Sequence, residues 1–311
     1  MAGLARFQAA PRPAPPSPMP APIRAGRASL RDYGGAERPV VFVPSLINPP
    51  EILDLSPDTS LLRWMAARGV RTWLVDWGAP DDADRDLDLG DHVERLLVPM
   101  LADLPEPPVL VGYCLGGTLA VAAAAIVPVA GVATIAAPWH FAGYGDARAE
   151  MARLWAMVQP TAEALGVLPM EVLQSAFWAL DPARTIAKYE RFAGLPPDSD
   201  AARAFVTLED WANAGAPLPY AAARALYVDC VAQDRPGRGA WTVAGRTVDP
   251  LALACPTVEF VSLTDRIVPA ATAIGWPDRR DLSLGHVGMM VGGRARSALW
   301  EPLANWIAGL D

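Results

Sequence analysis

The sequence is 311 residues long and 52% hydrophobic, which is enough for one or two domains with a full core. Its net charge of −8 and its isoelectric point near 5.0 argue against the basic surface that nucleic-acid binding requires. Its three cysteines, Cys114, Cys230 and Cys255, are too widely spaced for a disulfide framework or a metal site. Their odd number fits a reducing compartment.

Residues 1–34 are rich in proline and alanine and contain no continuous hydrophobic run. This composition is typical of a disordered tail rather than of a secretory signal, so we expect truncation to about residue 30 to be tolerated. Elsewhere no segment reaches the roughly 18 apolar residues of a membrane-spanning helix. We therefore expect a cytoplasmic protein without a membrane span.

The next hundred residues alternate between short apolar segments and helical patterns. Apolar runs bounded by proline or glycine predict buried strands at 39–44, 71–77, 108–111 and 129–136. Helical spacing predicts helices at 61–68, 92–104 and 118–127. We interpret His92 as a surface or supporting residue and His140 as a structural residue near a site. The alternating order predicts a doubly wound, mostly parallel sheet.

The strand at 108–111 leads into Gly-x-Cys-x-Gly-Gly and then into an alanine-rich helix. Strand, glycine-flanked nucleophile and helix are typical of the nucleophile elbow of the α/β-hydrolase fold, here with Cys114 in place of serine. Gly112, Gly116 and Gly117 permit the tight turn because they lack a Cβ. The positive end of the following helix favours the nucleophilic thiolate. The alternative is a buried cysteine whose glycine neighbours serve packing alone.

Between about 141 and 240, helical patterns with many aromatic residues replace the alternation, at 149–158, 170–179, 186–192, 208–212 and 220–231. A helical insertion of this length predicts a cap over an active site, although it could also simply complete the core. Strand patterns return at 240–243, 257–261 and 280–284, before a closing helix at 297–310. The predicted organisation is a disordered tail at 1–34, an α/β-hydrolase core in two parts at 35–140 and 241–311, and an inserted helical cap at 141–240.

Asp265 and His286 each follow a predicted strand, so we expect both at the sheet edge that carries Cys114, in the order nucleophile, acid, histidine. His286 would move the thiol proton, and Asp265 would orient the imidazole. The backbone N–H groups of Leu115 and of Ile47 or its neighbour are the predicted oxyanion hole. Because a thiolate exchanges one thioester for another at little free-energy cost, the pattern favours acyl transfer under a cap that excludes water.

Short motifs spread over both halves of the core carry a family resemblance. They are PSLIN at 44–48, ILDLSP at 52–57, RW at 63–64, VDWGAPD at 75–81, GYCLGG at 112–117, VAGRTVD at 243–249, DRIVP at 265–269 and GHV at 285–287. Together they resemble the polyhydroxyalkanoate synthases over about residues 39–140 and 240–295. The resemblance implies that 3-hydroxyacyl-CoA is polymerised to polyester by a triad of Cys114, Asp265 and His286, without a metal or a prosthetic group.

The chain is nearest to the short type of synthase, which implies a partner subunit or a homodimer and work at the surface of polyester granules. Two segments depart from the family: Arg266 stands where members usually have histidine, and residues 207–213 replace its Phe-Trp-Asn-x-Asp segment. The leading hypothesis is a synthase-like acyltransferase that forms a cysteine thioester with 3-hydroxyacyl-CoA. The alternatives are a cysteine-triad hydrolase (polyester depolymerase, thioesterase or lactone hydrolase) and a non-catalytic granule- or partner-binding subunit.

Overall fold

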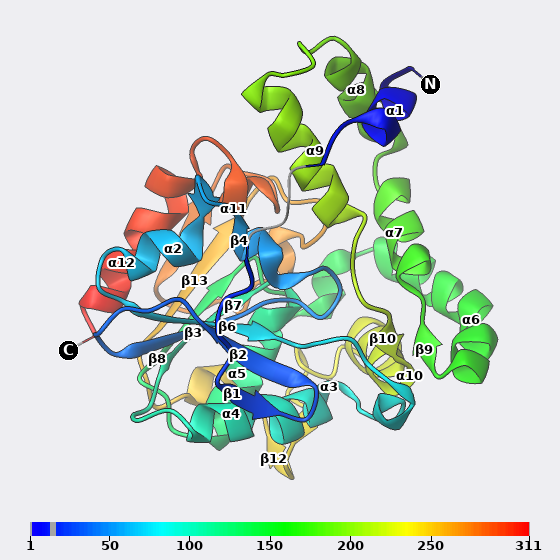
Figure 1. Cartoon of the computed structure of the whole chain (residues 1–311). Coiled ribbons are helices and arrows are strands. Elements are labelled where there is room, and N and C mark those ends of the chain that lie inside the picture. Colours follow the sequence, from blue (N-terminus) through cyan, green and yellow to red (C-terminus); the bar gives the residue numbers. More distant parts are fainter. Residues whose placement is uncertain (1, 13–16, 311) are drawn as a thin grey trace.

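The computed structural model describes residues 2–12 and 17–310, which build one eight-stranded sheet in the order β1-β2-β6-β3-β7-β8-β13-β14 (Figure 1). The strands from β6 to β14 are parallel, whereas β1 and β2 form an antiparallel hairpin at one edge. This sheet confirms the predicted α/β class. Its strands are β1 (Ile23–Ala25), β2 (Ala28–Asp32), β3 (Pro39–Val43), β6 (Arg71–Asp76), β7 (Val109–Tyr113), β8 (Gly131–Ile135), β13 (Thr257–Ser262) and β14 (Arg279–Leu282).

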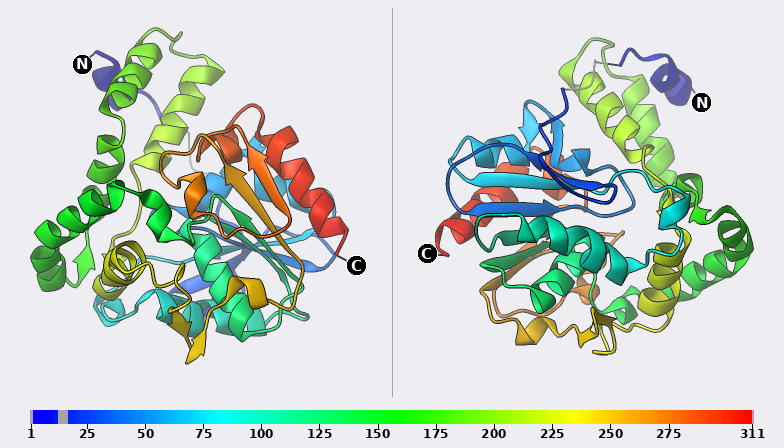
Figure 2. Two further views of the ribbon diagram at one scale, coloured as in Figure 1. Left: turned by 180° about the vertical axis from the view of Figure 1, so that it is seen from behind. Right: turned by 60° about the horizontal axis from the view of Figure 1, so that its bottom comes forward.

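Helices cover both faces of this sheet (Figure 2). In β3, Val41 and Val43 belong to one core cluster, and Val40 and Phe42 belong to the other, because successive side chains point to opposite faces. The central strands are therefore buried on both sides, as expected for parallel strands. The first cluster includes residues of α3 (Leu89–Asp91), the π-helical stretch His92–Leu97, α4 (Val98–Ala102) and α5 (Leu115–Ile126), and the second those of α2 (Leu61–Ala66), α11 (Gly288–Val291), the π-helical stretch Arg296–Trp300 and α12 (Glu301–Ala308).

After β8 the chain leaves the sheet and forms a helical segment that extends to one side of it (Figures 1 and 2). The predicted helices in this segment are confirmed, while the four-part division of the chain stays a prediction. Within the described residues, no helix is both long and apolar enough to span a membrane. The helices are α6 (Ala147–Leu165), α7 (Met170–Ala179), α8 (Pro182–Ala193), α9 (Asp200–Ala212), α10 (Tyr220–Arg224) and the π-helical stretch Ala225–Ala232.

Short elements complete the fold. The predicted strand at 240–243 is present, but it pairs within a small hairpin outside the main sheet. The two-stranded pairs are β4 (Asp54–Ser56) with β5 (Thr59–Ser60), β9 (Val167–Leu168) with β10 (Leu218–Pro219), and β11 (Thr242–Val243) with β12 (Arg246–Thr247). Short 3-10 turns lie at Pro50–Leu53, Asp82–Asp84, Phe141–Tyr144, Pro250–Ala252 and Ala270–Thr272.

The N-terminal segment is not the disordered tail that its composition predicts. Helix α1 (Ala2–Ala9) lies on the helical segment, where Phe7 packs in a small cluster with Phe192 (Figure 1). Strand β2 pairs with β6 and buries Leu30 completely. The prediction was wrong because averaging the proline and alanine content hid two short ordered stretches, one before and one after the prolines. Residues 13–16 of the predicted tail lie outside the described residues.

Candidate active site

Cys114 occupies the sharp turn between β7 and α5. Its φ of 56° and ψ of −134° are sparsely populated for a residue with a side chain, so the turn is strained. The surroundings demand glycine: a Cβ on Gly116 would lie 2.1 Å from the carbonyl oxygen of Val43, and one on Gly112 would lie 2.3 Å from the Cα of Gly117. This local sequence therefore lifts a partly exposed thiol to the carboxyl end of β7.

The loops after β13 and β14 bring a carboxylate and an imidazole together at the same edge of the sheet. The Nδ1–H of His286 donates to Oδ2 of Asp265 at 2.5 Å, which leaves the other ring nitrogen free for proton transfer. The Oδ1 atom of Asp265 accepts the N–H groups of Ile267, at 2.7 Å, and Val268, at 3.0 Å. The Asp265 side chain is fully buried. The carboxylate is thus held rigidly and can orient the imidazole.

The neighbours of His286 raise its pKa. Burial lowers the pKa of His286, but the negative charge of Cys114 and the hydrogen bond to Asp265 outweigh burial and raise this pKa well above its ordinary value. An imidazolium beside a thiolate is the charge state of an activated cysteine. Burial raises the pKa of the Cys230 and Cys255 thiols, which disfavours their thiolates.

Tyr113 supports the histidine, a role that the sequence analysis did not predict. Its ring stacks on the imidazole of His286 with centroids 4.9 Å apart, and its hydroxyl donates to the carbonyl oxygen of His286 at 3.3 Å. Burial raises the pKa of Tyr113 well above its ordinary value, so the hydroxyl stays a neutral donor. One signal in the sequence could have indicated this role: Tyr113 stands directly before the elbow cysteine, at the same end of the strand.

The two N–H groups predicted for the oxyanion hole differ in their surroundings. Leu115 is the first residue of α5, where a helical N–H has no carbonyl partner four residues earlier. Ile47 lies in the loop after β3 and lines the same pocket as Cys114, but its N–H donates to the Ser45 hydroxyl at 3.2 Å. The N–H of Leu115 is therefore available to a ligand, whereas that of Ile47 must first leave this bond.

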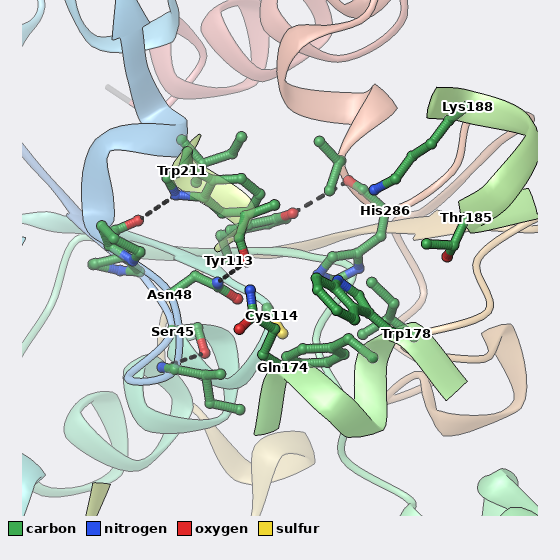
Figure 3. Close-up of a pocket in the computed structure, with 18 residues that line it drawn as sticks. Ser45, Asn48, Tyr113, Cys114, Gln174, Trp178, Thr185, Lys188, Trp211 and His286 are labelled. Atoms are coloured by element: carbon green, nitrogen blue, oxygen red, sulfur yellow. Dashed lines mark hydrogen bonds between the residues drawn. The ribbon is translucent and has the colours of Figure 1, made fainter. Parts of the chain in front are cut away.

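A pocket of about 170 Å³ opens above Cys114 (Figure 3). We call the strand-end loops that carry Cys114, Asp265 and His286 its floor, and helices α7, α8 and α9 its roof. The roof contributes the residues that sequence reasoning missed, because helical periodicity does not show which helix face covers a site. They are Gln174, Phe177, Trp178, Thr185, Lys188, Trp211 and Ala212.

The remaining histidines and Arg266 do not line the pocket. His92 is not the surface residue that was one of its two interpretations: it is fully buried, with Nε2 2.7 Å from a nitrogen of Arg27, and burial lowers its pKa to about 4. His140 hydrogen-bonds backbone groups and does not line the pocket. Arg266 forms an ion pair with Asp181 of the roof. Within residues 2–12 and 17–310, no three His, Cys, Asp or Glu side chains gather as metal ligands.

A family model and several known proteins match this sequence. The model of the Alpha/beta hydrolase family matches residues 40–272. The chain is 28% identical over 291 residues to the poly(3-hydroxyalkanoate) polymerase subunit PhaC of Haloferax mediterranei, covering 87% of this chain but only 58% of that protein. It is 26% identical to the subunit of the same name from Allochromatium vinosum, covering 86% and 80% of the two chains. The predicted resemblance to polyhydroxyalkanoate synthases is thus confirmed.

Solved structures agree on the fold. An esterase from Thermogutta terrifontis has a TM-score of 0.55 and 15% identity, covering 93% of this chain and 98% of its own. A monoacylglycerol lipase from Paleococcus ferrophilus has a TM-score of 0.55 and 13% identity, covering 92% and 100%. At such low identity these likenesses show the fold alone. The relatives named PhaC show that the sequence is similar to polyhydroxyalkanoate synthases. The family match shows that this chain belongs to the alpha/beta hydrolase family.

Proposed function

We propose that this protein is an acyltransferase that takes 3-hydroxyacyl groups from coenzyme A thioesters onto Cys114 and passes them to a hydroxyl acceptor. The observation that carries the proposal is the buried hydrogen bond from His286 to Asp265 at the sheet edge that also presents the strained Cys114. A nucleophile, a base and a residue that orients the base are the parts that covalent acyl transfer needs.

In the first half of the proposed reaction, the thiolate of Cys114 attacks the thioester carbonyl while His286 holds the proton that the thiol has lost. The N–H of Leu115, with that of Ile47, would stabilise the oxyanion of the tetrahedral intermediate. When the intermediate collapses, the bond from carbon to the coenzyme A sulfur breaks. The leaving thiolate takes the proton from His286, and an acyl thioester remains on Cys114.

In the second half, His286 would remove the proton from the hydroxyl of an acceptor, whose oxygen attacks the acyl carbon. The bond from the acyl carbon to the Cys114 sulfur then breaks, the new ester leaves, and the proton taken from the hydroxyl remains with the Cys114–His286 pair. Water competes with the acceptor for the same acyl group, so the outcome depends on which of the two the roof admits. The apolar roof residues Phe177, Trp178 and Trp211 favour an acceptor that is itself an acyl chain.

The relatives named PhaC support polyester as the product, and their printed names call them subunits. We propose that this chain also works with a partner subunit or a second copy, in the cytoplasm at a polyester surface. Large exposed apolar side chains suit such a contact: Leu180 lies at the end of α7, and Ile186 lies in α8. The alternative, a cysteine-triad hydrolase, differs only in the acceptor, and product analysis separates the two.

The test is incubation with 3-hydroxybutyryl-CoA, followed by peptide mass spectrometry, coenzyme A release and polymer analysis. Cys114→Ala should lower turnover by roughly 10⁴-fold or more without unfolding, because alanine fits the same turn. Cys255→Ala, which changes a thiol outside the pocket, is the matched control and should keep its activity. No label on Cys114, or near-normal turnover of Cys114→Ala, would refute the proposal. Free hydroxyacid as the main product would favour the hydrolase.

A further inference from the structure

Only one of the 26 basic residues in the chain is a lysine, and it lies in the roof of the pocket. Lys188 extends from α8 with its ammonium end toward His286 (Figure 3). Among the pocket-lining residues that the structure describes, Lys188 and His286 are those whose side chains can carry a positive charge. The proposed reaction above gives Lys188 no part.

A buried carboxylate holds this ammonium in place from behind. The Nζ atom of Lys188 lies 2.8 Å from Oε1 and 2.7 Å from Oε2 of Glu209, and the hydroxyl of Tyr189 donates to Oε2 at 2.9 Å. Glu209 is only 5% exposed and does not line the pocket. An ammonium has three donors, of which the two carboxylate oxygens engage at most two. One N–H therefore remains for a ligand.

The side-chain amides of the pocket wall and one of its two indoles are already engaged. The amide nitrogen of Asn48 donates to the carbonyl oxygens of residues 212 and 214, at 3.5 and 3.3 Å. That of Gln174 donates to Asn213, and the indole N–H of Trp211 donates to the carbonyl oxygen of Pro49 at 2.8 Å. Lys188 thus presents a charged donor in a largely apolar wall, one helical turn after the Thr185 hydroxyl.

We propose that Lys188 determines substrate specificity by donating a hydrogen bond to an oxygen on the bound acyl chain, either a 3-hydroxyl or an ester carbonyl. The inference rests on the proposed acyl transfer and deepens it by naming what selects oxygenated acyl chains. Arginine would suit this position less, since its planar fork would pair with both oxygens of Glu209. Lysine leaves a rotatable third donor for the ligand.

The size of the effect follows from the charge of the donor. A hydrogen bond to a charged group corresponds to about ten- to hundredfold in specificity, and an unsubstituted acyl chain leaves the donor without a partner. The preference for 3-hydroxybutyryl-CoA over butyryl-CoA, expressed as a ratio of kcat/KM for Cys114 acylation, should therefore fall by about this factor when the ammonium is removed.

The experiment compares these two substrates, together with 3-acetoxybutyryl-CoA, in three variants. The double variant Lys188→Met, Glu209→Gln removes the ammonium without leaving a buried unpaired carboxylate. Glu209→Gln alone keeps the ammonium and one oxygen that accepts from it, so it should keep most of the preference, and Lys188→Arg should retain it only in part. Circular dichroism verifies that each variant is folded.

Loss of the preference in the double variant, with butyryl-CoA turnover retained, supports the inference. If loss is confined to the hydroxyl substrate, the partner is the hydroxyl; if acetoxy turnover falls too, any oxygen serves. An unchanged ratio in the folded double variant overturns the inference while the proposed function stands. If none of the three substrates acylates Cys114 in the wild type, the result is different, because it refutes the proposed function itself.

Discussion

The floor and the roof of the pocket are built in different ways. The floor follows from strands whose residues are almost all buried, such as β7 and β13, and from a turn in which backbone atoms touch. The roof helices α7, α8 and α9 bury few side chains, namely Met170, Leu173, Phe192, Ala202, Val206 and Glu209. The floor is therefore specified by backbone geometry, whereas the roof depends on a small number of side-chain contacts.

Residues 2–12, which include helix α1, pack against the roof. Phe7 of α1 meets the rings of Tyr189 and Phe205 edge-on, with centroids 5.7 and 6.4 Å apart. Arg6 donates to two carbonyl oxygens at the end of α8, those of residues 193 and 195, both at 2.6 Å. Arg12 forms an ion pair with Asp210 of α9. We infer that the roof can move relative to the floor more easily than the floor itself can deform.

The largest effect should come from a methyl group placed in the elbow. Gly116→Ala puts a Cβ 2.1 Å from a backbone oxygen of residue 43, so the turn cannot close without shifting β3, and we expect a loss of about 3 kcal/mol or more. In the roof, the nearest atom to a Cβ on Gly194 is 3.5 Å away and φ is −87°. Gly194→Ala should change stability by less than about 1 kcal/mol.

Denaturant unfolding of both variants measures this difference between floor and roof. A Gly116→Ala protein as stable as the wild type would show that the elbow tolerates a side chain, and the contrast between the two regions would then be wrong. A strongly destabilised Gly194→Ala protein would also contradict this contrast, because the roof would then tolerate an added methyl group no better than the floor does.

An intermediate effect should come from Phe7→Ala, and it should be local. The change removes the aromatic ring that joins α1 to the roof, while it leaves the sheet and the elbow intact. Hydrogen exchange should accelerate in α8 and α9 but not in β7 or β13. Leu4→Ala, at a 40% exposed position of the same helix, is the control and should leave exchange unchanged. Unchanged exchange in Phe7→Ala would show that α1 does not stabilise the roof.

The floor was predictable from sequence because its chemistry is written in local motifs. The glycines at 112 and 116 on either side of Cys114 indicate a tight turn. The place of Asp265 and His286 after predicted strands indicates the sheet edge at which they lie. Lys188 and Trp211 were not predicted as pocket residues, because their positions depend on how whole helices tilt against one another. The sequence also did not predict that the N-terminal hairpin and α1 are ordered, because each is stabilised by partners far away in the sequence.

The smallest effect concerns the contact that joins floor to roof. Arg266, which follows Asp265, pairs with Asp181 at the start of α8, and its side chain is 64% exposed. Exposed ion pairs contribute at most about 1 kcal/mol and weaken with salt. Arg266→His, which introduces the residue usual in the synthases, should therefore leave Cys114 acylation within about threefold of the wild type.

The Arg266→His variant needs a control in which surface charge changes elsewhere. Arg203→His breaks an ion pair with Asp200 inside α9 and so changes surface charge without touching the contact between floor and roof. If Arg266→His alone altered acylation by more than tenfold at high salt, where the ion pair is screened, electrostatic pairing could not explain it. The residue after Asp265 would then act on the imidazole of His286 directly. Position 266 would have to be counted among the residues of the floor that shape the site.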